Sequence, residues 1–216
     1  MCGIAGSVSS HYLGDRPASI ASLSHRGPDS QGEVVIACAG KDVWLAHTRL
    51  AILDLSPTGH QPMQSRDGRW WVTFNGEIYN HLELRKELLE PFRGHSDTET
   101  LIELLAYQGV EATVQHLNGM FSFAALDTKN NQLFIVRDPF GIKPLYYTQS
   151  DGVFGFASEA RALFELGIVD REPDDLALQG FLSLRYLPSP QTLWNGVNRL
   201  KPGHFLCLDL ASMDLT

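Results

Sequence analysis

Met1-Cys2-Gly3-Ile4-Ala5-Gly6, the first six residues, place a cysteine in second position at the start of an apolar run. We expect Met1 to be removed because a small residue follows it, which would give Cys2 both a thiol and a free α-amino group. A free α-amine has a pKa of about 7.7–8.0 in model peptides, so at neutral pH part of it can accept the thiol proton. Nucleophile and base would then belong to one residue.

A cysteine in this position also has a simpler interpretation, because chain ends are usually disordered. The choice between the two therefore depends on the rest of the chain. The other cysteines, Cys38 and Cys207, lie in apolar runs and are interpreted as buried small hydrophobic residues. No two cysteines have the spacing of a metal site or a redox motif, so we expect no metal site and a reduced, cytoplasmic setting.

Composition limits the classes of function. The 216 residues suggest one domain, or one domain with an extension, and the apolar fraction of 44% is enough to build a core. The formal net charge of −8 argues against a nucleic-acid partner or an anionic membrane. The sequence has neither a signal-peptide pattern nor an apolar stretch of membrane-spanning length, so we expect no membrane association.

Short apolar runs separated by turn clusters predict a chain rich in β-strands. The predicted strands are 4–8, 33–39, 43–46, 70–74, 121–126, 133–137, 145–147 and 153–157. The three strands between residues 120 and 147 follow one another closely, which favours antiparallel pairing.

Helices are fewer, and each is predicted from a residue that can cap it. They are expected from Asn80 through Leu88 and Leu89, after Ser96, over 159–166 after Ser158, and from Asp174 or Asp175 to Leu184. Ser96 and Glu99 have the spacing of a capping box. These elements predict an α+β fold in which two antiparallel sheets are each covered on the outer face by helices.

Three polar positions are candidates for substrate contacts. Arg49 lies in a mostly apolar run and offers a planar fork of donors for a carboxylate, or else forms a surface ion pair. Asn75-Gly76 is either a tight hairpin turn or an oxyanion hole, made by the Asn75 amide and a nearby backbone N–H. Asp97 either simply begins a helix or pairs with a substrate ammonium group. The polar loop 25–29 is either a surface turn or a segment that folds over the substrate.

Taken together, these residues specify a substrate. Arg49 suits an α-carboxylate, Asp97 suits an α-ammonium group, and Asn75 with Gly76 suits a tetrahedral oxyanion formed when Cys2 attacks. The ligand is then an amino acid with a reactive carbonyl in its side chain. L-glutamine fits this description.

At these residues the sequence resembles the class II glutamine amidotransferases, which are N-terminal-nucleophile hydrolases, and in particular the amidotransferase half of glutamine-hydrolysing asparagine synthetases. The motifs that carry the resemblance occur in order over most of the chain: Met1-Cys2-Gly3-Ile4-Ala5-Gly6, His25-Arg26-Gly27-Pro28-Asp29, Ala46-His47-Thr48-Arg49-Leu50-Ala51-Ile52, Phe74-Asn75-Gly76-Glu77-Ile78-Tyr79-Asn80, Ser96-Asp97-Thr98-Glu99, Gly119-Met120-Phe121-Ser122-Phe123-Ala124, and Arg137-Asp138-Pro139-Phe140-Gly141-Ile142-Lys143-Pro144-Leu145-Tyr146-Tyr147. Any one of them is weak evidence, whereas the ordered set is specific.

The resemblance implies a four-layer α-β-β-α sandwich and a set of roles. Cys2 would be the nucleophile that forms a γ-glutamyl thioester, and Asn75 and Gly76 would form the oxyanion hole. The residues implied to bind glutamine are Arg49, Leu50, Ala51, Ile52, Leu53, Asn75, Gly76, Glu77 and Asp97.

The resemblance also divides the chain into an amidotransferase domain over residues 1–186 and a connector over 187–216. The connector would lead toward an ATP-dependent synthetase domain or subunit, whose Ser-Gly-Gly-x-Asp-Ser loop does not occur in the sequence. We therefore expect no cofactor in this chain, and ATP and Mg²⁺ only in the absent part. The acceptor of the ammonia would be aspartate, a sugar carboxylate of a polysaccharide or an antibiotic precursor. A glutamine-binding module without catalysis remains as an alternative function. A homodimer remains a possible assembly.

Overall fold

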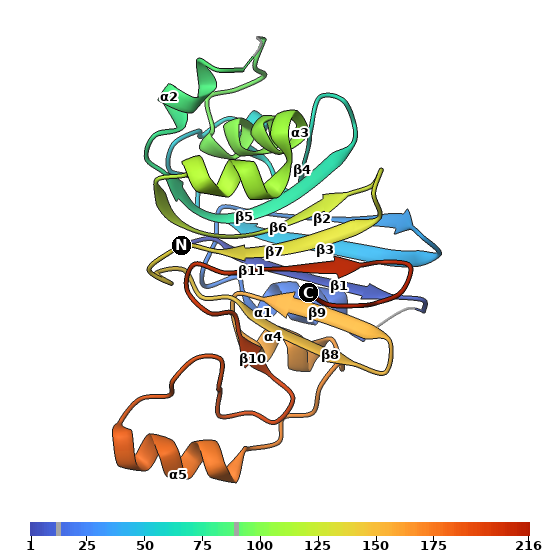
Figure 1. Ribbon diagram of the computed structural model, residues 1–216, viewed down its shortest axis with the longest axis vertical. Coiled ribbons are helices and arrows are strands. Elements are labelled where there is room, and N and C mark those ends of the chain that lie inside the picture. Colours follow the sequence, from blue (N-terminus) through green and yellow to red (C-terminus); the bar gives the residue numbers. More distant parts are fainter. Residues whose placement is uncertain (12–13, 89–90) are drawn as a thin grey trace.

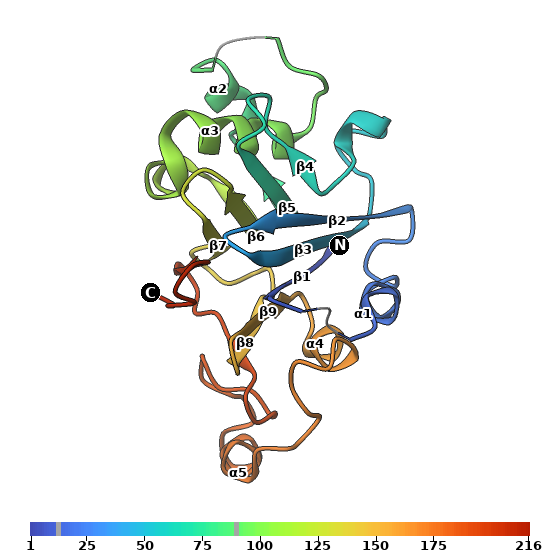
Figure 2. The ribbon, with the colours of Figure 1, turned by 90° about the vertical axis from the view of Figure 1, so that its right-hand side faces the viewer.

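The computed structural model describes residues 1–11, 14–88 and 91–216 and contains two antiparallel sheets that lie face to face (Figures 1 and 2). Sheet A has six strands in the order β10-β8-β9-β1-β3-β2, and sheet B has five in the order β11-β7-β6-β5-β4. The strands are β1 (Gly3–Ser9), β2 (Ser30–Cys38), β3 (Lys41–Arg49), β4 (Met63–Gln64), β5 (Trp70–Ile78), β6 (Gly119–Asp127), β7 (Gln132–Arg137), β8 (Tyr146–Ser150), β9 (Val153–Ala157), β10 (Asn198–Arg199) and β11 (Phe205–Asp209).

Helices cover the outer face of each sheet. Those longer than one turn are α1 (Arg16–Ser22), α2 (His81–Arg85), α3 (Asp97–His116), α4 (Ala160–Glu165) and α5 (Asp175–Leu184), and a short 3₁₀ turn, η1, spans Pro57–Gly59. Helices α2 and α3 lie on the side of sheet B, and α1 and α4 lie on the side of sheet A (Figures 1 and 2). The expected α+β fold with four layers is confirmed.

Three apolar clusters fill the spaces between the four layers. Phe74 packs with Leu101 between sheet B and α3, whereas Trp44 packs with Leu163 between sheet A and the helices α1 and α4. Between the sheets, Leu45 belongs to a cluster shared by both. Trp44 and Leu45 are neighbours in β3 and serve different clusters because successive side chains of a strand point to opposite faces. Each fully buried side chain of this size contributes about 1.5–3 kcal/mol relative to exposure.

Every predicted strand overlaps an observed one, but the predicted bounds are too short at the site. β5 continues through Asn75-Gly76 to Ile78, and Asn75 pairs with Ser122 and Gly76 with Phe121. The Asn-Gly pair is therefore not a hairpin turn. Three observed strands were not predicted. β4 and β10 have two residues each, too few to produce a detectable pattern. β11 has five residues, and its apolar run was interpreted only as the surroundings of Cys207.

The helices differ more from expectation. The predicted helix from Asn80 is observed only as α2, and Leu89 lies outside the described residues. Ser158 does not cap α4, because its hydroxyl accepts a hydrogen bond from the Ile4 N–H of β1 at 3.0 Å. Helix α1 was not predicted; it begins after Asp15, whose side chain accepts from the Ala18 N–H.

The last thirty residues add one strand to each sheet. β10 pairs with β8 and β11 pairs with β7, so the segment 187–216 is folded against the rest of the chain. The boundary expected between residues 186 and 187 stays a prediction. Helix α5 projects from the body of the molecule and exposes Leu176, Leu182 and Leu184 (Figure 1). Within the described ranges, no helix combines the length and apolar character that crossing a membrane requires.

Candidate active site

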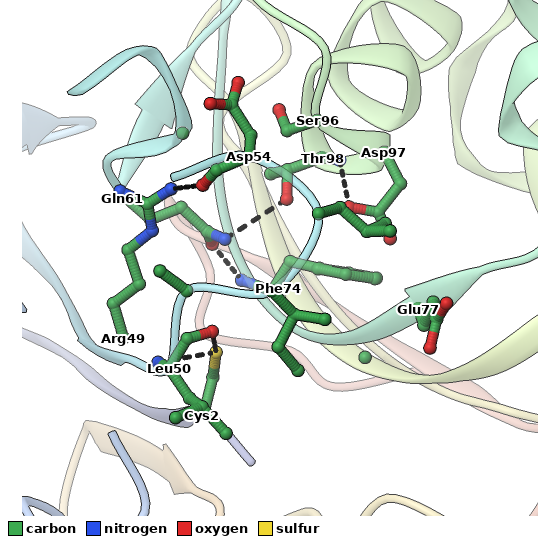
Figure 3. Close-up of a pocket in the computed structure, with 15 residues that line it drawn as sticks. Cys2, Arg49, Leu50, Asp54, Gln61, Phe74, Glu77, Ser96, Asp97 and Thr98 are labelled. Carbon is green, nitrogen blue, oxygen red and sulfur yellow. Dashed lines mark hydrogen bonds between the residues drawn. The ribbon is translucent and has the colours of Figure 1, made fainter. Parts of the chain in front are cut away.

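A pocket of about 70 Å³ lies where the start of β1, the segment after β3, β5 and the start of α3 meet. Figure 3 shows Cys2 and Arg49 on one side of it and Asp97 on the other. The residues that line it are Cys2, Arg49, Leu50, Ala51, Ile52, Leu53, Asp54, Gly59, Gln61, Phe74, Gly76, Glu77, Ser96, Asp97 and Thr98. The structure thus brings together every predicted site residue except Asn75.

The Cys2 thiol is held against the backbone of Leu50. The Leu50 N–H donates to the Cys2 sulfur at 3.4 Å, and the thiol lies 3.7 Å from the Leu50 carbonyl oxygen. On the other side, the Arg26 Nε donates to the Cys2 carbonyl oxygen at 3.0 Å. A Cβ at Gly3 would lie only 2.6 Å from the Thr48 Oγ1, so glycine after Cys2 allows β1 to pair with β3 this closely.

Burial influences the protonation of the Cys2 thiol. It raises the pKa of the Cys2 thiol, and the Leu50 hydrogen bond together with the charges of the chain's amino terminus and Arg49 oppose this rise only in part. Met1 is exposed and occupies the terminal position. While Met1 is present, Cys2 has no α-amine of its own, and a thiol with a raised pKa is largely protonated at neutral pH.

Arg49 is held by carbonyl groups. Its guanidinium donates to the Ser56 carbonyl at 3.0 Å and to the Asp54 carbonyl, both in the segment that follows β3 (Figure 3). A Cβ at Gly59 would lie 2.2 Å from the Arg49 Nη2, so a side chain at this position would displace the guanidinium. No acidic side chain pairs with Arg49 in the described part of the chain. Among the described residues, Arg49 therefore does not form the surface ion pair that was the alternative interpretation. Its positive charge is available at the pocket.

Asp97 is a buried carboxylate at the first position of α3. It accepts from the Ile78 N–H and from the Thr98 N–H, each at 2.9 Å. Burial raises its pKa to about 6 despite these hydrogen bonds. Among the described residues no basic side chain pairs with it. An unpaired carboxylate in such a place is suited to a cationic group of a ligand.

Asn75 is buried in β5 behind the pocket wall. Both polar atoms of its side chain are without a hydrogen-bond partner among the described residues, a costly state for a buried amide. Thr73, two residues earlier on the same face, donates its hydroxyl to the Ala46 carbonyl of sheet A at 3.0 Å. By the alternation of the strand, Asn75 faces the space between the sheets, on the side of β1.

Gly76 has a packing reason for its lack of a side chain. A Cβ there would lie 2.4 Å from the Met120 carbonyl of the paired strand β6. Glycine at this position is thus required by the close approach of the two strands.

Six of the residues that line the pocket were not predicted from the sequence. Gln61 donates to the Thr98 hydroxyl at 3.2 Å and accepts from the Phe74 N–H at 2.6 Å, which ties the segment after β3 to both α3 and β5 (Figure 3). Nothing in the sequence around Gln61 indicated this contact. Ser96 and Thr98 flank the predicted Asp97, and only the charged member of that motif was selected.

Asp54 is the missed residue with a detectable signal. Its carboxylate accepts from the Ser56 N–H at 2.8 Å and the Ser56 hydroxyl at 2.6 Å, a pattern typical of an Asp two residues before a Ser in a turn. It also accepts from the Thr58 hydroxyl and from the His95 N–H. The Ser56 hydroxyl contributes most to holding the pKa of Asp54 well below its usual range. Asp54 therefore fixes the segment that holds Arg49.

The loop 25–29 supports the pocket from outside. Asp29 accepts from the Ala51 N–H at 2.8 Å, and Arg26 holds the Cys2 carbonyl. None of the five residues of this loop lines the pocket. The loop thus positions two of the walls.

Comparison with known proteins shows the family of this chain. The family model described as "Glutamine amidotransferase domain" matches residues 1–216. The chain belongs to this family. It is 38% identical over 213 residues to "Asparagine synthetase [glutamine-hydrolyzing] 1" of Bacillus subtilis, an alignment that covers 94% of this chain and 33% of the relative. It is 33% identical over 204 residues to "Amidase chyE" of Penicillium rubens, covering 94% of this chain and 29% of that protein.

This glutamine amidotransferase domain spans about a third of the length of the curated relatives that it matches. Among solved structures, it superposes on the glutamine phosphoribosylpyrophosphate amidotransferase of Bacillus subtilis with a TM-score of 0.69 and 17% identity. That superposition covers all of this chain and 49% of the other. At this level of identity the likeness concerns the fold, and it agrees with two facing antiparallel sheets flanked by helices.

Proposed function

We propose that this domain hydrolyses L-glutamine to glutamate and ammonia, with Cys2 as the nucleophile. The observation that carries the proposal is that the Cys2 thiol lies at one pocket with the Arg49 guanidinium and the buried Asp97 carboxylate, neither of which has a partner of opposite charge among the described residues. An α-amino acid brings a carboxylate and an ammonium group to such a site. Membership of the glutamine amidotransferase domain family supports glutamine as this amino acid.

Binding uses the charged ends of the substrate. Arg49 pairs with the α-carboxylate, and Asp97 accepts from the α-ammonium group. Leu50, Ala51, Ile52, Leu53 and Glu77 form the walls along the substrate. This placement directs the side-chain amide of glutamine toward the Cys2 sulfur.

Met1 removal activates the nucleophile. The exposed Met1 is cleaved, and the α-amine of Cys2 then accepts the thiol proton. This base offsets the burial that otherwise keeps the thiol protonated.

The first chemical step forms a thioester. The Cys2 sulfur attacks the amide carbon, the carbon–sulfur bond forms, and the electron pair of the carbonyl moves to its oxygen. The Asn75 amide and the Gly76 N–H donate to this oxyanion. The carbon–nitrogen bond then breaks, and the nitrogen leaves as ammonia with the proton that the α-amine had accepted. Water attacks the thioester in the second step, which releases glutamate and restores the thiol.

The ammonia serves amide synthesis in a part of the protein, or a subunit, beyond this chain. The likeness to asparagine synthetases supports aspartate as the acceptor, activated there with ATP and Mg²⁺. The likeness to a fungal amidase supports the alternative of another carboxylate, such as a sugar acid or an antibiotic precursor. Three free cysteines support a reduced, cytoplasmic setting. The apolar face of α5 is suited to contact with the synthetase part or with a second copy in a homodimer.

A glutaminase assay tests this proposal against the alternative of a silent glutamine-binding module. The chain is purified, removal of Met1 is checked by mass spectrometry, and glutamate release is measured. We expect release by the wild type and by the control Cys207→Ala, and none by Cys2→Ala. Full activity of Cys2→Ala, or no activity of the processed wild type, would refute the proposal.

A further inference from the structure

A second hollow, of about 390 Å³, shares no lining residue with the pocket around Cys2, which we call the glutamine pocket. We call it the Arg199 groove. Its walls come from the loop after α1, the start of α4, β8 and the segment 187–199, and they include Arg26, Glu159, Tyr146, Trp194 and Arg199. Its volume lies in the range of about 300–1,000 Å³ that is typical of small-molecule sites.

Positive charge exceeds negative charge around this groove. Glu159 is the one carboxylate among the described residues that line it, and it already receives three groups. These are His25 at 2.9 Å, Arg26 at 3.0 Å and Arg161 at 3.3 Å. The negative charge of Glu159 is therefore already paired with these neighbours and does not balance the positive charge of Arg199.

Arg199 has no acidic partner within the described ranges. Its Nη2 donates to the Leu187 carbonyl at 2.7 Å, and its Nε is buried without a hydrogen-bond partner among these residues. A further arginine lies close enough to repel it, since burial and then the charge of Arg199 lower the pKa of Arg137. In a chain with a formal net charge of −8, such a concentration of cations calls for a specific reason.

We propose that the Arg199 groove binds a small anionic ligand, a carboxylate or phosphate compound, with Arg199 as its main charge contact. An arginine fork is suited to either anion. The rings of Tyr146 and Trp194 supply flat apolar walls beside the charged contact. The glutamine pocket lies elsewhere, so the ligand is not the substrate of Cys2.

Arg26 connects the groove to the nucleophile. Its Nη1 pairs with Glu159 in the groove wall while its Nε donates to the Cys2 carbonyl. An anion that draws Arg26 toward the groove changes the position of the residue that attacks glutamine. Occupancy of the groove therefore alters the rate of glutamine hydrolysis.

Titration of the purified chain with citrate and, separately, with inorganic phosphate at constant ionic strength tests the site. Binding is measured by calorimetry on the wild type, on Arg199→Gln and on the control Arg171→Gln. Arg171 also stacks near Trp194 but does not line the groove. We expect saturable binding of one of the two anions, weakened about ten-fold or more by Arg199→Gln and unchanged by Arg171→Gln. The anion that binds identifies the ligand as a carboxylate or a phosphate.

Absence of saturable binding for both anions would overturn the site, and so would equal weakening by the two variants. A second measurement holds even if Arg199→Gln does not fold. The indole N–H signal of Trp194, assigned with Trp194→Phe, should shift on addition of the anion and should do so equally in saturating glutamine. Loss of the shift in glutamine would place the anion in the substrate pocket and refute the proposal. An unchanged glutaminase rate at saturating anion would refute the link through Arg26.

Discussion

At the scale of the residue, Asp97 makes substrate binding depend on pH. Its folded-state pKa of about 6 lies above the ordinary value of 3.8, so its charge disappears as the pH falls through 6. The Michaelis constant for glutamine should be lowest above pH 7 and should rise below pH 6. Asp97→Asn should raise it about ten- to a hundred-fold at pH 7.5 and remove the dependence. A wild-type Michaelis constant that stays flat from pH 5 to 8 would contradict this role.

Asn75 should matter for turnover and not for stability. Its buried amide has no hydrogen-bond partner among the described residues, and leaving such a group unpaired costs about 1–3 kcal/mol. Asn75→Ala should therefore keep or raise the melting temperature while it lowers kcat by about 10² to 10³, as for other oxyanion-hole donors. A raised Michaelis constant with kcat preserved would make Asn75 a binding contact only.

Charge and motif were enough to predict nine of the residues that line the pocket, but not those that hold them in place. Arg49 was predicted because its planar fork of donors suits a carboxylate, and Asp97 because a carboxylate suits an ammonium group. Gln61 carries no charge, and its contacts with Thr98 and Phe74 join segments far apart in the sequence. Such contacts depend on the tertiary fold, which local patterns do not encode.

At the scale of the element, the start of β1 is fixed by the end of β9. The Ser158 hydroxyl accepts from the Ile4 N–H, and the Ser158 N–H donates to the Ile4 carbonyl at 2.8 Å, two residues from Cys2. Ser158→Ala leaves the Ile4 N–H buried without an acceptor, so we expect a loss of about 1–3 kcal/mol in the free energy of unfolding. Glutaminase activity should fall as well, because Cys2 loses part of its support.

Chemical denaturation and a glutaminase assay check this expectation, with Ser150→Ala as the matched control. Ser150 is exposed in the neighbouring strand β8. If both variants lose equal stability and activity, the hydroxyl of Ser158 has no special part in placing the nucleophile.

The same contact explains why one helix cap was wrongly predicted. Serine is a residue type that often caps helices, yet the Ser158 hydroxyl accepts from the Ile4 N–H of β1 instead. Glu159 occupies the N-cap position of α4 and makes no capping hydrogen bond. Most strands were easier to predict, since β1, β3, β5, β6 and β9 bury runs of mostly apolar residues. Helix α1 was missed because only Ile20 is an apolar anchor of any size within it, and its packing against sheet A is a long-range feature.

At the scale of the whole molecule, the chain is a glutamine amidotransferase domain and spans about a third of the length of its curated relatives. We therefore predict that the purified chain, given glutamine, aspartate, ATP and Mg²⁺, produces glutamate but neither asparagine nor AMP. Activation of a carboxylate by ATP needs a phosphate-binding loop and metal ligands. Amino-acid analysis and nucleotide chromatography check this prediction, and asparagine in the product would contradict it.

In the proposed reaction Cys2, freed of Met1, attacks glutamine. The most direct measurement is acid quenching of the chain during turnover, followed by mass spectrometry of its peptides. We predict a mass increase of one glutamyl group on the peptide that begins with Cys2, and its absence in Cys2→Ala. Glutamate release without any adduct on that peptide, or with an adduct on Cys38 or Cys207 instead, would contradict the account.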